Sequence, residues 1–131
     1  MSKMKMMSEM KYTILVRTLS EANRRDHWAV KMKRTALQKK LAWFYSHDQI
    51  NKALTQGVLF SYSGVFKIKL TRLAQRLLDT DNLAGAMKAV RDGIAKALGR
   101  DDGPRSGIEW VYDQRQDKVK NGVDVEMYWN D

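Results

Sequence analysis

Four aspartates flank one helix-like run of the sequence, in the stretch LLDTDNLAGAMKAVRDGIAKALGRDDG over residues 77–103. Asp79 and Asp81 stand one residue apart before the run, and Asp101 and Asp102 follow it. Mg²⁺ prefers oxygen ligands and usually takes one or two carboxylates together with water and phosphate. An ion held by these side chains could activate water and stabilise the charge that develops on a phosphodiester.

The elements around Asp79 and Asp81 decide whether the two carboxylates can act together. A strand is predicted over residues 65–74, where apolar and basic residues alternate, and it leads the chain towards the pair. If the extended conformation persists, residues i and i+2 point to the same side, so both carboxylates would reach one cation. Asp81 or Asn82 is expected to cap the helix that follows, and Gly99 to end it.

The helix predicted over residues 82–98 has two different faces at 100° per residue. Its apolar stripe consists of Leu83, Met87, Val90, Ile94 and Leu98. Asp81, Gly85, Lys88 and Asp92 share the opposite face. Glycine in a helix interior costs about 1 kcal/mol relative to alanine, so Gly85 predicts that something large must approach this face closely. Lys88 could hold a phosphate there or stabilise a leaving oxygen.

A purely structural interpretation of these residues stays open. Asp-x-Asp after a strand can be a helix cap, and Lys88 with Asp92 forms an ordinary i,i+4 pair. Asp101 and Asp102, followed by Gly-Pro, suit a turn. The spacing alone leaves both interpretations standing.

The charge of the chain indicates a polyanionic partner. Lys and Arg number 24 against 15 Asp and Glu, which gives a net charge of +9 and a pI near 9.9. Nucleic acid is the first candidate, an anionic membrane surface the second, and a solvated basic surface without a partner the third. The absence of cysteine excludes disulfides, thiolate catalysis and Cys-type zinc sites, and fits a reducing compartment. With no run of about 18 apolar residues, no membrane span is expected.

The patterns along the chain predict one α+β domain with a small mixed sheet and two main helices. The expected elements are strands over 11–19 and 65–74, helices over 28–49 and 82–98, and a C-terminal β-hairpin over 108–116 and 123–129. Residues 1–10 are expected to be a flexible N-terminus and residues 11–131 the domain. Trp28, Trp43 and Phe44 are expected to pack on the sheet, and Trp110 and Trp129 in the core or at a dimer contact.

Basic residues concentrate on the first helix and on the strand before Asp79. They are the expected phosphate contacts, with a solvated surface as the alternative. The predicted DNA-binding residues are Asn23, Arg24, Arg25, Lys31, Lys33, Arg34, Lys67, Lys69 and Arg72.

The run from Asp79 to Asp102 resembles the signature of the RusA-type Holliday junction resolvases, which are small, basic, Mg²⁺-dependent homodimeric endonucleases of phage and prophage. That signature is Asp-x-Asp-Asn, a helix carrying a lysine, an aspartate before a small residue, and an Asp-Asp pair before a C-terminal strand. The initial strand, the asparagine in the basic loop EANRRDHW and the basic helix are also similar. The resemblance covers residues 12–129, and its specific part is 79–102.

The resemblance implies roles for individual residues. Asp79, Asp81 and Asp102 would be catalytic, metal-binding carboxylates, with Asp101 as a further metal ligand and Lys88 as the catalytic lysine. Mg²⁺, or else Mn²⁺, would be the cofactor, and a homodimer would nick a four-way DNA junction symmetrically. The protein would act in the cytoplasm of a bacterium or a phage-infected cell.

Two features depart from a simple fit. Lys88 stands seven residues after Asp81, whereas the lysine of the best-known family members stands four residues after the second aspartate. These two positions share a helix face but differ by about 4.5 Å along the helix axis. A straight helix over 82–98 would also be about 25 Å long and would separate Asp101 and Asp102 from Asp79 and Asp81. Either the helix breaks near Gly93, or the acidic pair folds back, or it completes the site of a partner subunit.

Two other functions remain as alternatives. A non-catalytic DNA-binding protein of the same fold would use the carboxylates only as caps and turns. A structural or accessory phage protein would use its charge for assembly.

Overall fold

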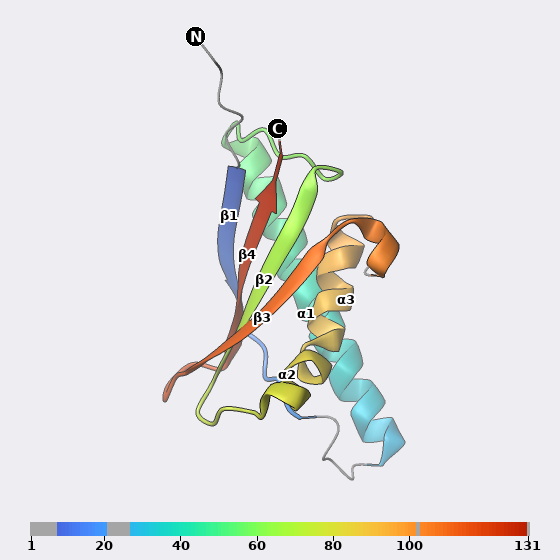
Figure 1. Ribbon diagram of the computed structural model, residues 1–131, viewed down its shortest axis with the longest axis vertical. Coiled ribbons are helices and arrows are strands. Elements are labelled where there is room, and N and C mark those ends of the chain that lie inside the picture. Colours follow the sequence, from blue (N-terminus) through green and yellow to red (C-terminus); the bar gives the residue numbers. More distant parts are fainter. Residues whose placement is uncertain (1–7, 21–26, 102, 131) are drawn as a thin grey trace.

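A four-stranded mixed sheet with the strand order β1-β4-β2-β3 forms the frame of the protein (Figure 1). The computed structural model describes residues 8–20, 27–101 and 103–130. The strands are β1 (Ser8–Ile14), β2 (Val65–Ala74), β3 (Glu109–Gln116) and β4 (Gly122–Trp129). β4 pairs antiparallel with β1 and β2, and β2 pairs parallel with β3. The prediction of a single α+β domain with a small mixed sheet is confirmed.

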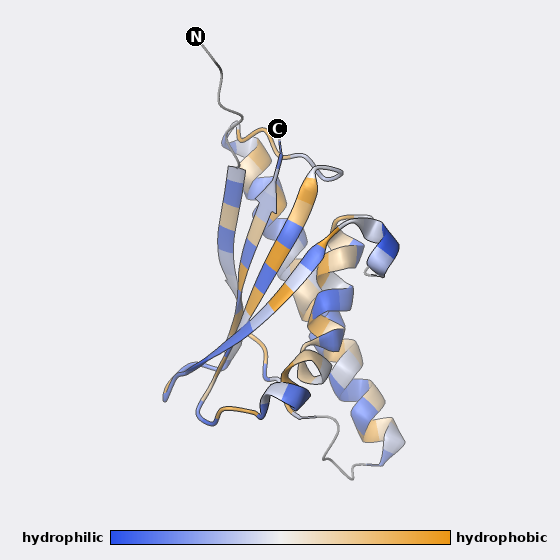
Figure 2. Cartoon of the chain, in the orientation of Figure 1, coloured by the Kyte–Doolittle hydropathy of each residue, from blue (hydrophilic) through white to orange (hydrophobic). Residues whose placement is uncertain are grey.

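Alternate residues of each strand face the helices, as the pleat of a strand requires. Figure 2 shows this alternation as hydrophobic and hydrophilic bands along the strands. Ile68 and Leu70 of β2 belong to the core, while Lys67 and Lys69 face the other way. The core residues of β4 are Val123, Val125, Met127 and Trp129. The basic outer face predicted for residues 65–74 is therefore present.

The C-terminal strands β3 and β4 follow one another in opposite directions, as the predicted hairpin does, but they are not hydrogen-bonded neighbours. β2 lies between them, pairing Ile68 with Trp110 on one side and with Met127 on the other. The predicted strand pairing is therefore corrected. Trp129 is 1% exposed and lies in the core, and Trp110 is half-buried beneath the guanidinium of Arg91.

The first strand begins at Ser8, inside the segment that was expected to be flexible, and ends at Ile14 rather than Leu19. Beyond Ile14 the chain leaves the sheet, yet Val16 and Thr18 remain buried. Residues 1–7 lie outside the described residues.

Three α-helices and a short 3₁₀ turn complete the domain: α1 (Trp28–Thr55), α2 (Thr80–Ala86), α3 (Lys88–Ala97) and η1 (Pro104–Ser106). α1 is six residues longer than predicted. Gly57 follows its C-terminal end with φ +83°, a conformation that glycine adopts without steric cost. Within the described residues, no helix has the length and apolar character that crossing a bilayer requires.

The helix predicted over 82–98 is divided into α2 and α3 at Met87. Gly93, the expected breaking point, lies inside α3 and has a different role. A Cβ atom at Gly93 would stand 2.3 Å from the carbonyl oxygen of Lys39 and 2.7 Å from the Cβ of Ala42. Glycine therefore allows the backbones of α1 and α3 to approach one another closely. As predicted, Gly99 ends α3, with φ +65° and hydrogen bonds back to the last turn.

The buried face of α1 is small and polar rather than aromatic. Its buried residues are Gln38, Ala42, Ser46 and Ile50. The polar members have partners: Gln38 Nε2 donates to the carbonyl oxygen of Arg17 over 2.9 Å, and the Ser46 hydroxyl lies 2.6 Å from that of Tyr12. Burial raises the pKa of Tyr12.

The large side chains of α1 point outward instead. Trp28 is 68% exposed, Phe44 53% and Trp43 36%. The prediction that these three rings pack on the sheet is wrong, because the buried stripe of α1 consists instead of Gln38, Ala42, Ser46 and Ile50 at intervals of four residues.

Candidate functional site

Asp79 and Asp81 lie at the beginning of α2 and are both exposed. Asp79 is the N-cap residue with φ −61° and ψ 147°, but its side chain makes no capping hydrogen bond. Its backbone carbonyl accepts a hydrogen bond from the amide of Asn82 over 2.9 Å. The extended conformation ends here, since Thr80 already belongs to α2. The two carboxylates are therefore related by the first turn of a helix and not by a strand repeat.

A groove runs along the contact between α1 and α3, next to α2. One part has a volume of about 290 Å³ and the adjoining part about 540 Å³. We call it the α1–α3 groove, and its lining residues are Lys31, Thr35, Gln38 and Lys39 of α1, Gly85 of α2, Lys88, Ala89, Asp92, Ala95 and Lys96 of α3, and Gly99, Arg100 and Asp101 after it. The groove is thus rich in lysine and bordered by two aspartates.

Gly85 and Lys88 are brought together in this groove, as the sequence predicted. A Cβ atom at Gly85 would meet no atom within 4 Å, so packing among the described residues does not require glycine there. The Lys88 Nζ lies 2.7 Å from an oxygen of Asp92, which is the ordinary i,i+4 pair. Lys88 remains largely exposed.

Asp101 lies at the other end of α3, where it borders the groove beside Lys96 and Arg100. The ten residues of α3 span about 15 Å. Asp101 is therefore separated from Asp79 and Asp81 by the length of this helix, despite the break at Met87. Asp102 lies outside the described residues. Within the described ranges there is no group of three or more His, Cys, Asp or Glu side chains that could hold a metal ion.

Arg100 positions the turn that carries Asp101, a role that the sequence did not reveal. Its guanidinium donates to the carbonyl oxygens of Tyr62 and Val65, over 3.1 and 2.6 Å, and to that of Ser106. These bonds fix the segment after α3 to the chain that enters β2.

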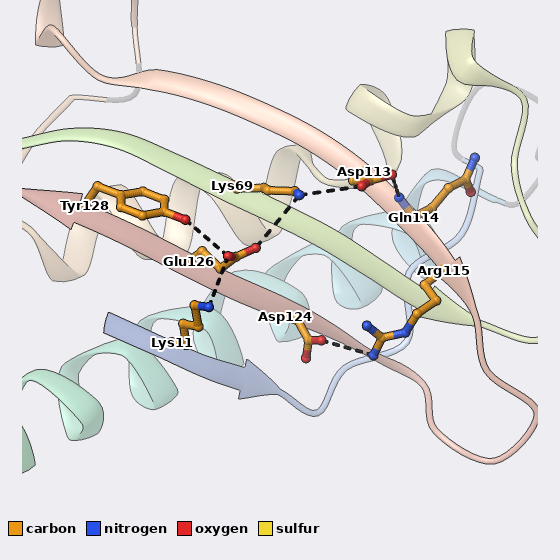
Figure 3. Close-up of polar contacts among 8 residues, drawn as sticks. All are labelled: Lys11, Lys69, Asp113, Gln114, Arg115, Asp124, Glu126 and Tyr128. Atoms are coloured by element: carbon orange, nitrogen blue, oxygen red, sulfur yellow. Dashed lines mark hydrogen bonds and ion pairs between the residues drawn. The ribbon is translucent and has the colours of Figure 1, made fainter. Parts of the chain in front are cut away.

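The predicted DNA-binding residues do not form one surface. Lys31 lines the α1–α3 groove, and Lys33 and Arg34 lie nearby on α1. Lys69 lies on the open face of the sheet, away from the helices (Figure 3). Lys67, two residues earlier on the same strand, points to the same face. Asn23, Arg24 and Arg25 lie outside the described residues.

On the open face, the cations are matched by carboxylates of neighbouring strands. Lys69 Nζ lies 3.6 Å from Asp113 and 4.0 Å from Glu126, and Lys11 Nζ lies 3.8 Å from Glu126 (Figure 3). Lys67 lies over the ring of Tyr128, 5.7 Å from its centroid. Arg115 and Thr13 both contact Asp124. This mixed charge makes the open face a weaker candidate for a polyanion than the α1–α3 groove.

Arg72 is not a surface residue, and its predicted contact with DNA is corrected. It is 5% exposed, and its Nε donates to the hydroxyl of Thr18 over 2.9 Å. Its two terminal nitrogens donate to the carbonyl oxygens of Thr18 and Arg76. Burial lowers the pKa of Arg72. The side chain joins the segment after β1 to the end of β2.

Lys96 also lines the α1–α3 groove, although it was not among the predicted site residues. It lies two helical turns after Lys88, and Asp92 stands midway between them, so the repeated spacing of four residues was the signal that could have identified it. Lys96 and Lys39 approach one another across the contact that Gly93 permits.

Comparison with known proteins adds no assignment to this geometry. No protein-family model matches the chain, and no curated protein matches it.

Proposed function

We propose that this protein is a divalent-metal-dependent endonuclease that acts on branched DNA and resolves four-way junctions by paired nicks. The observation that carries the proposal is the pair of exposed carboxylates at the beginning of α2, beside the lysine-lined α1–α3 groove. Asp79 makes no side-chain capping bond, although capping is the usual structural use of an aspartate at this position. We therefore assign this carboxylate to ligand binding rather than to capping.

The donor chemistry of the pair fits Mg²⁺ or Mn²⁺. Asp79 and Asp81 offer carboxylate oxygens, and Mg²⁺ sites commonly use only one or two carboxylates, completed by water and substrate phosphate. A bound ion would supply Lewis-acid stabilisation of the phosphodiester and lower the pKa of water. Lys88, one turn beyond Gly85 on the groove side, would hold a phosphate oxygen and stabilise charge on the leaving group.

The groove supplies the positive surface that such carboxylates need in order to retain DNA. Lys31, Lys39, Lys88 and Lys96 line it, against Asp92 and Asp101. Phosphate contacts of this kind release counterions, so binding is expected to weaken steeply as salt concentration rises. Exposed Gly85 leaves space for a close approach of the DNA backbone.

A homodimer would account for the position of Asp101. This residue stands at the far end of α3 from Asp79, so it would serve the site of a partner subunit more readily than its own. A two-fold dimer also matches the two-fold symmetry of a four-way junction. Mixing Asp79→Asn subunits with Asp102→Asn subunits tests this arrangement. If the site is shared between subunits, the mixture should regain nicking activity. If each subunit holds a complete site, the mixture should remain inactive.

The test of the function is cleavage of an end-labelled synthetic four-way junction with Mg²⁺, with and without chelator. Wild type is compared with Asp81→Asn and with the control Asp113→Asn, an exposed aspartate on the open face of the sheet. Symmetric nicks that require the metal and Asp81, but not Asp113, are the expected result. Tight junction binding without nicks under any divalent metal would instead establish a binding protein, the alternative favoured by the absence of a three-ligand group among the described residues.

If the wild-type protein bound the junction no more tightly than duplex DNA, the remaining interpretation would be an accessory protein whose charge serves assembly. The cytoplasm of a bacterium or phage-infected cell is the compartment in which the proposed nuclease would meet branched DNA.

A further inference from the structure

A second binding feature adjoins the α1–α3 groove at Trp43. The indole is 36% exposed and borders a hollow of about 450 Å³. The hollow is lined by Ala36, Lys39, Lys40, Trp43 and Lys96. Three lysines thus line the hollow together with one aromatic ring, and no carboxylate of the described residues belongs to the lining.

The position of the ring is set by the contact between the two helices. A Cβ atom at Gly93 would stand 3.0 Å from the backbone nitrogen of Trp43, so glycine lets α3 lie directly against this turn of α1. Lys96, one turn after Gly93, then reaches the indole with its Nζ 6.0 Å from the ring centroid. His47 stacks on the indole with 5.1 Å between centroids and 19° between planes, which holds the ring in place.

The chemistry of the hollow selects among ligands. An apolar protein surface could pack against the indole but would offer no anionic partner to the three lysines. Association would then remove water from these charges without compensation, which weakens binding. A nucleotide satisfies both parts, since its base has a π face for the indole and its phosphates carry negative charge for the lysines. Stacking of a base on an aromatic side chain contributes about 1–3 kcal/mol and requires that the base be out of a duplex stack.

We propose that Trp43 is a stacking platform for an unstacked nucleobase, with Lys39, Lys40 and Lys96 binding the phosphates that flank it. The inference deepens the proposed function and rests on it, because it names the feature by which branched DNA is preferred. Lys39 and Lys96 line both this hollow and the α1–α3 groove, so a strand could pass from one to the other. Strands at a branch point can expose an unstacked base, whereas an uninterrupted duplex does not.

The experiment measures binding without cleavage, in the presence of EDTA, with the full-length protein. The probes are a fluorescein-labelled oligothymidine of about 12 nucleotides, a duplex of the same length and a four-way junction. Trp43→Ala is expected to raise the Kd for oligothymidine and junction roughly 5- to 100-fold and to change the Kd for duplex less than about twofold. Trp43→Phe should retain most of the affinity, because a ring remains.

Two further variants separate stacking from charge. Lys96→Gln is expected to lower the slope of log K against log salt by about 0.7, the contribution of one phosphate contact in a single strand, while Trp43→Ala leaves the slope unchanged. Phe44→Ala is the matched control, since Phe44 is the adjacent and more exposed aromatic residue and does not line the hollow. It should bind all three probes as the wild type does.

An unchanged Kd of Trp43→Ala for oligothymidine and junction would overturn the inference, and so would an equal loss in Phe44→Ala. These results are independent of nicking. Selective binding through Trp43 without nicks under any metal would support this site and refute the nuclease. Nicking that survives Trp43→Ala with unaltered affinity would refute this site and support the nuclease.

Discussion

Replacing Gly93 with alanine tests the helix contact on which the groove and the Trp43 hollow both depend. The added Cβ would stand 2.3 Å from the Lys39 carbonyl oxygen, about 1 Å short of an ordinary van der Waals contact. The obstructing atoms belong largely to the backbone of α1, so the helices must move apart. Overpacking costs about 3 kcal/mol in such a setting, and the better helix propensity of alanine offsets about 1 kcal/mol.

The net loss of unfolding free energy is therefore about 2 kcal/mol, which corresponds to a fall of about 1 M in the urea midpoint for a domain of this size. Gly85→Ala is the matched control, because a Cβ there meets no atom within 4 Å. That variant should gain about 0.5–1 kcal/mol in stability. Urea unfolding followed by circular dichroism measures both.

A Gly93→Ala variant as stable as the wild type would refute the reasoning that glycine sets the distance between α1 and α3. The Gly85→Ala variant has a second use. If it is more stable but binds DNA less tightly, then the open space at Gly85 is needed by the ligand, as the groove suggests.

Three other changes test individual contacts. Arg72→Met should lower the unfolding free energy by about 2–4 kcal/mol, because three hydrogen bonds are lost, two of them to the buried Thr18. It should leave the salt dependence of DNA binding unchanged, and a steep change in that dependence would restore Arg72 as a phosphate contact. Tyr12→Phe should cost about 1–3 kcal/mol at neutral pH, since the buried Ser46 hydroxyl loses its partner. Burial raises the pKa of Tyr12 above its ordinary value of 10, so the unfolded state loses this proton before the folded state does. The unfolding free energy of the wild type should therefore be fully present below pH 10 and fall by up to about 1.4 kcal/mol per pH unit above it. Denaturation curves measured across this pH range should show a smaller decrease in unfolding free energy for Tyr12→Phe. Lys88→Gln should change stability by less than about 0.5 kcal/mol, as expected for an exposed i,i+4 pair, yet reduce junction nicking about 100-fold or more; intact nicking would remove Lys88 from the proposed chemistry.

The strands β2 and β4 could be predicted well because apolar and polar residues alternate along most of each strand. Residues 65–74 were predicted as a strand and form β2, and the two C-terminal strands differ from their predicted bounds by a single residue at most. Their pairing could not be predicted, because insertion of β2 between β3 and β4 depends on contacts distant in sequence. The first strand was predicted over residues 11–19 but lies at Ser8–Ile14. Val16 and Thr18 are buried and continue the alternation of buried and exposed residues, although pairing with β4 ends at Ile14.

The helices show where hydrophobic pattern misleads. In α1 the residues Trp28, Trp43 and Phe44 looked like the inner face, but the buried stripe is Gln38, Ala42, Ser46 and Ile50, which is too polar for a hydrophobic pattern to identify. Gly93 itself looked like a point where the helix breaks. The sequence alone does not distinguish a glycine that disrupts a helix from one that permits close packing of two helices. The division at Met87 has no such marker in the sequence.

For the candidate site, local spacing placed Gly85, Lys88 and Asp92 together correctly, since all three lie within a few helical turns. Arg72 was misjudged because its charge was given more weight than the alternation of the strand, which places it on the same side of β2 as Ile68 and Leu70. Here the segment around Thr18 covers the guanidinium. Lys39 and Lys96 meet only through tertiary packing, which no local pattern indicates.

The order of the sheet also has a consequence for how the chain reaches its native state. β4 follows β1, β2 and β3 in sequence, yet it lies between β1 and β2 and pairs residues 123–129 with residues 8–14. During synthesis, β4 cannot pair with β1 and β2 until Trp129 has left the ribosome. Until then, the sheet that carries their apolar faces is incomplete. Such distant pairing slows folding and prolongs exposure to aggregation. Ribosome-bound chains halted before residue 122 should depend on chaperones, whereas the released protein should not.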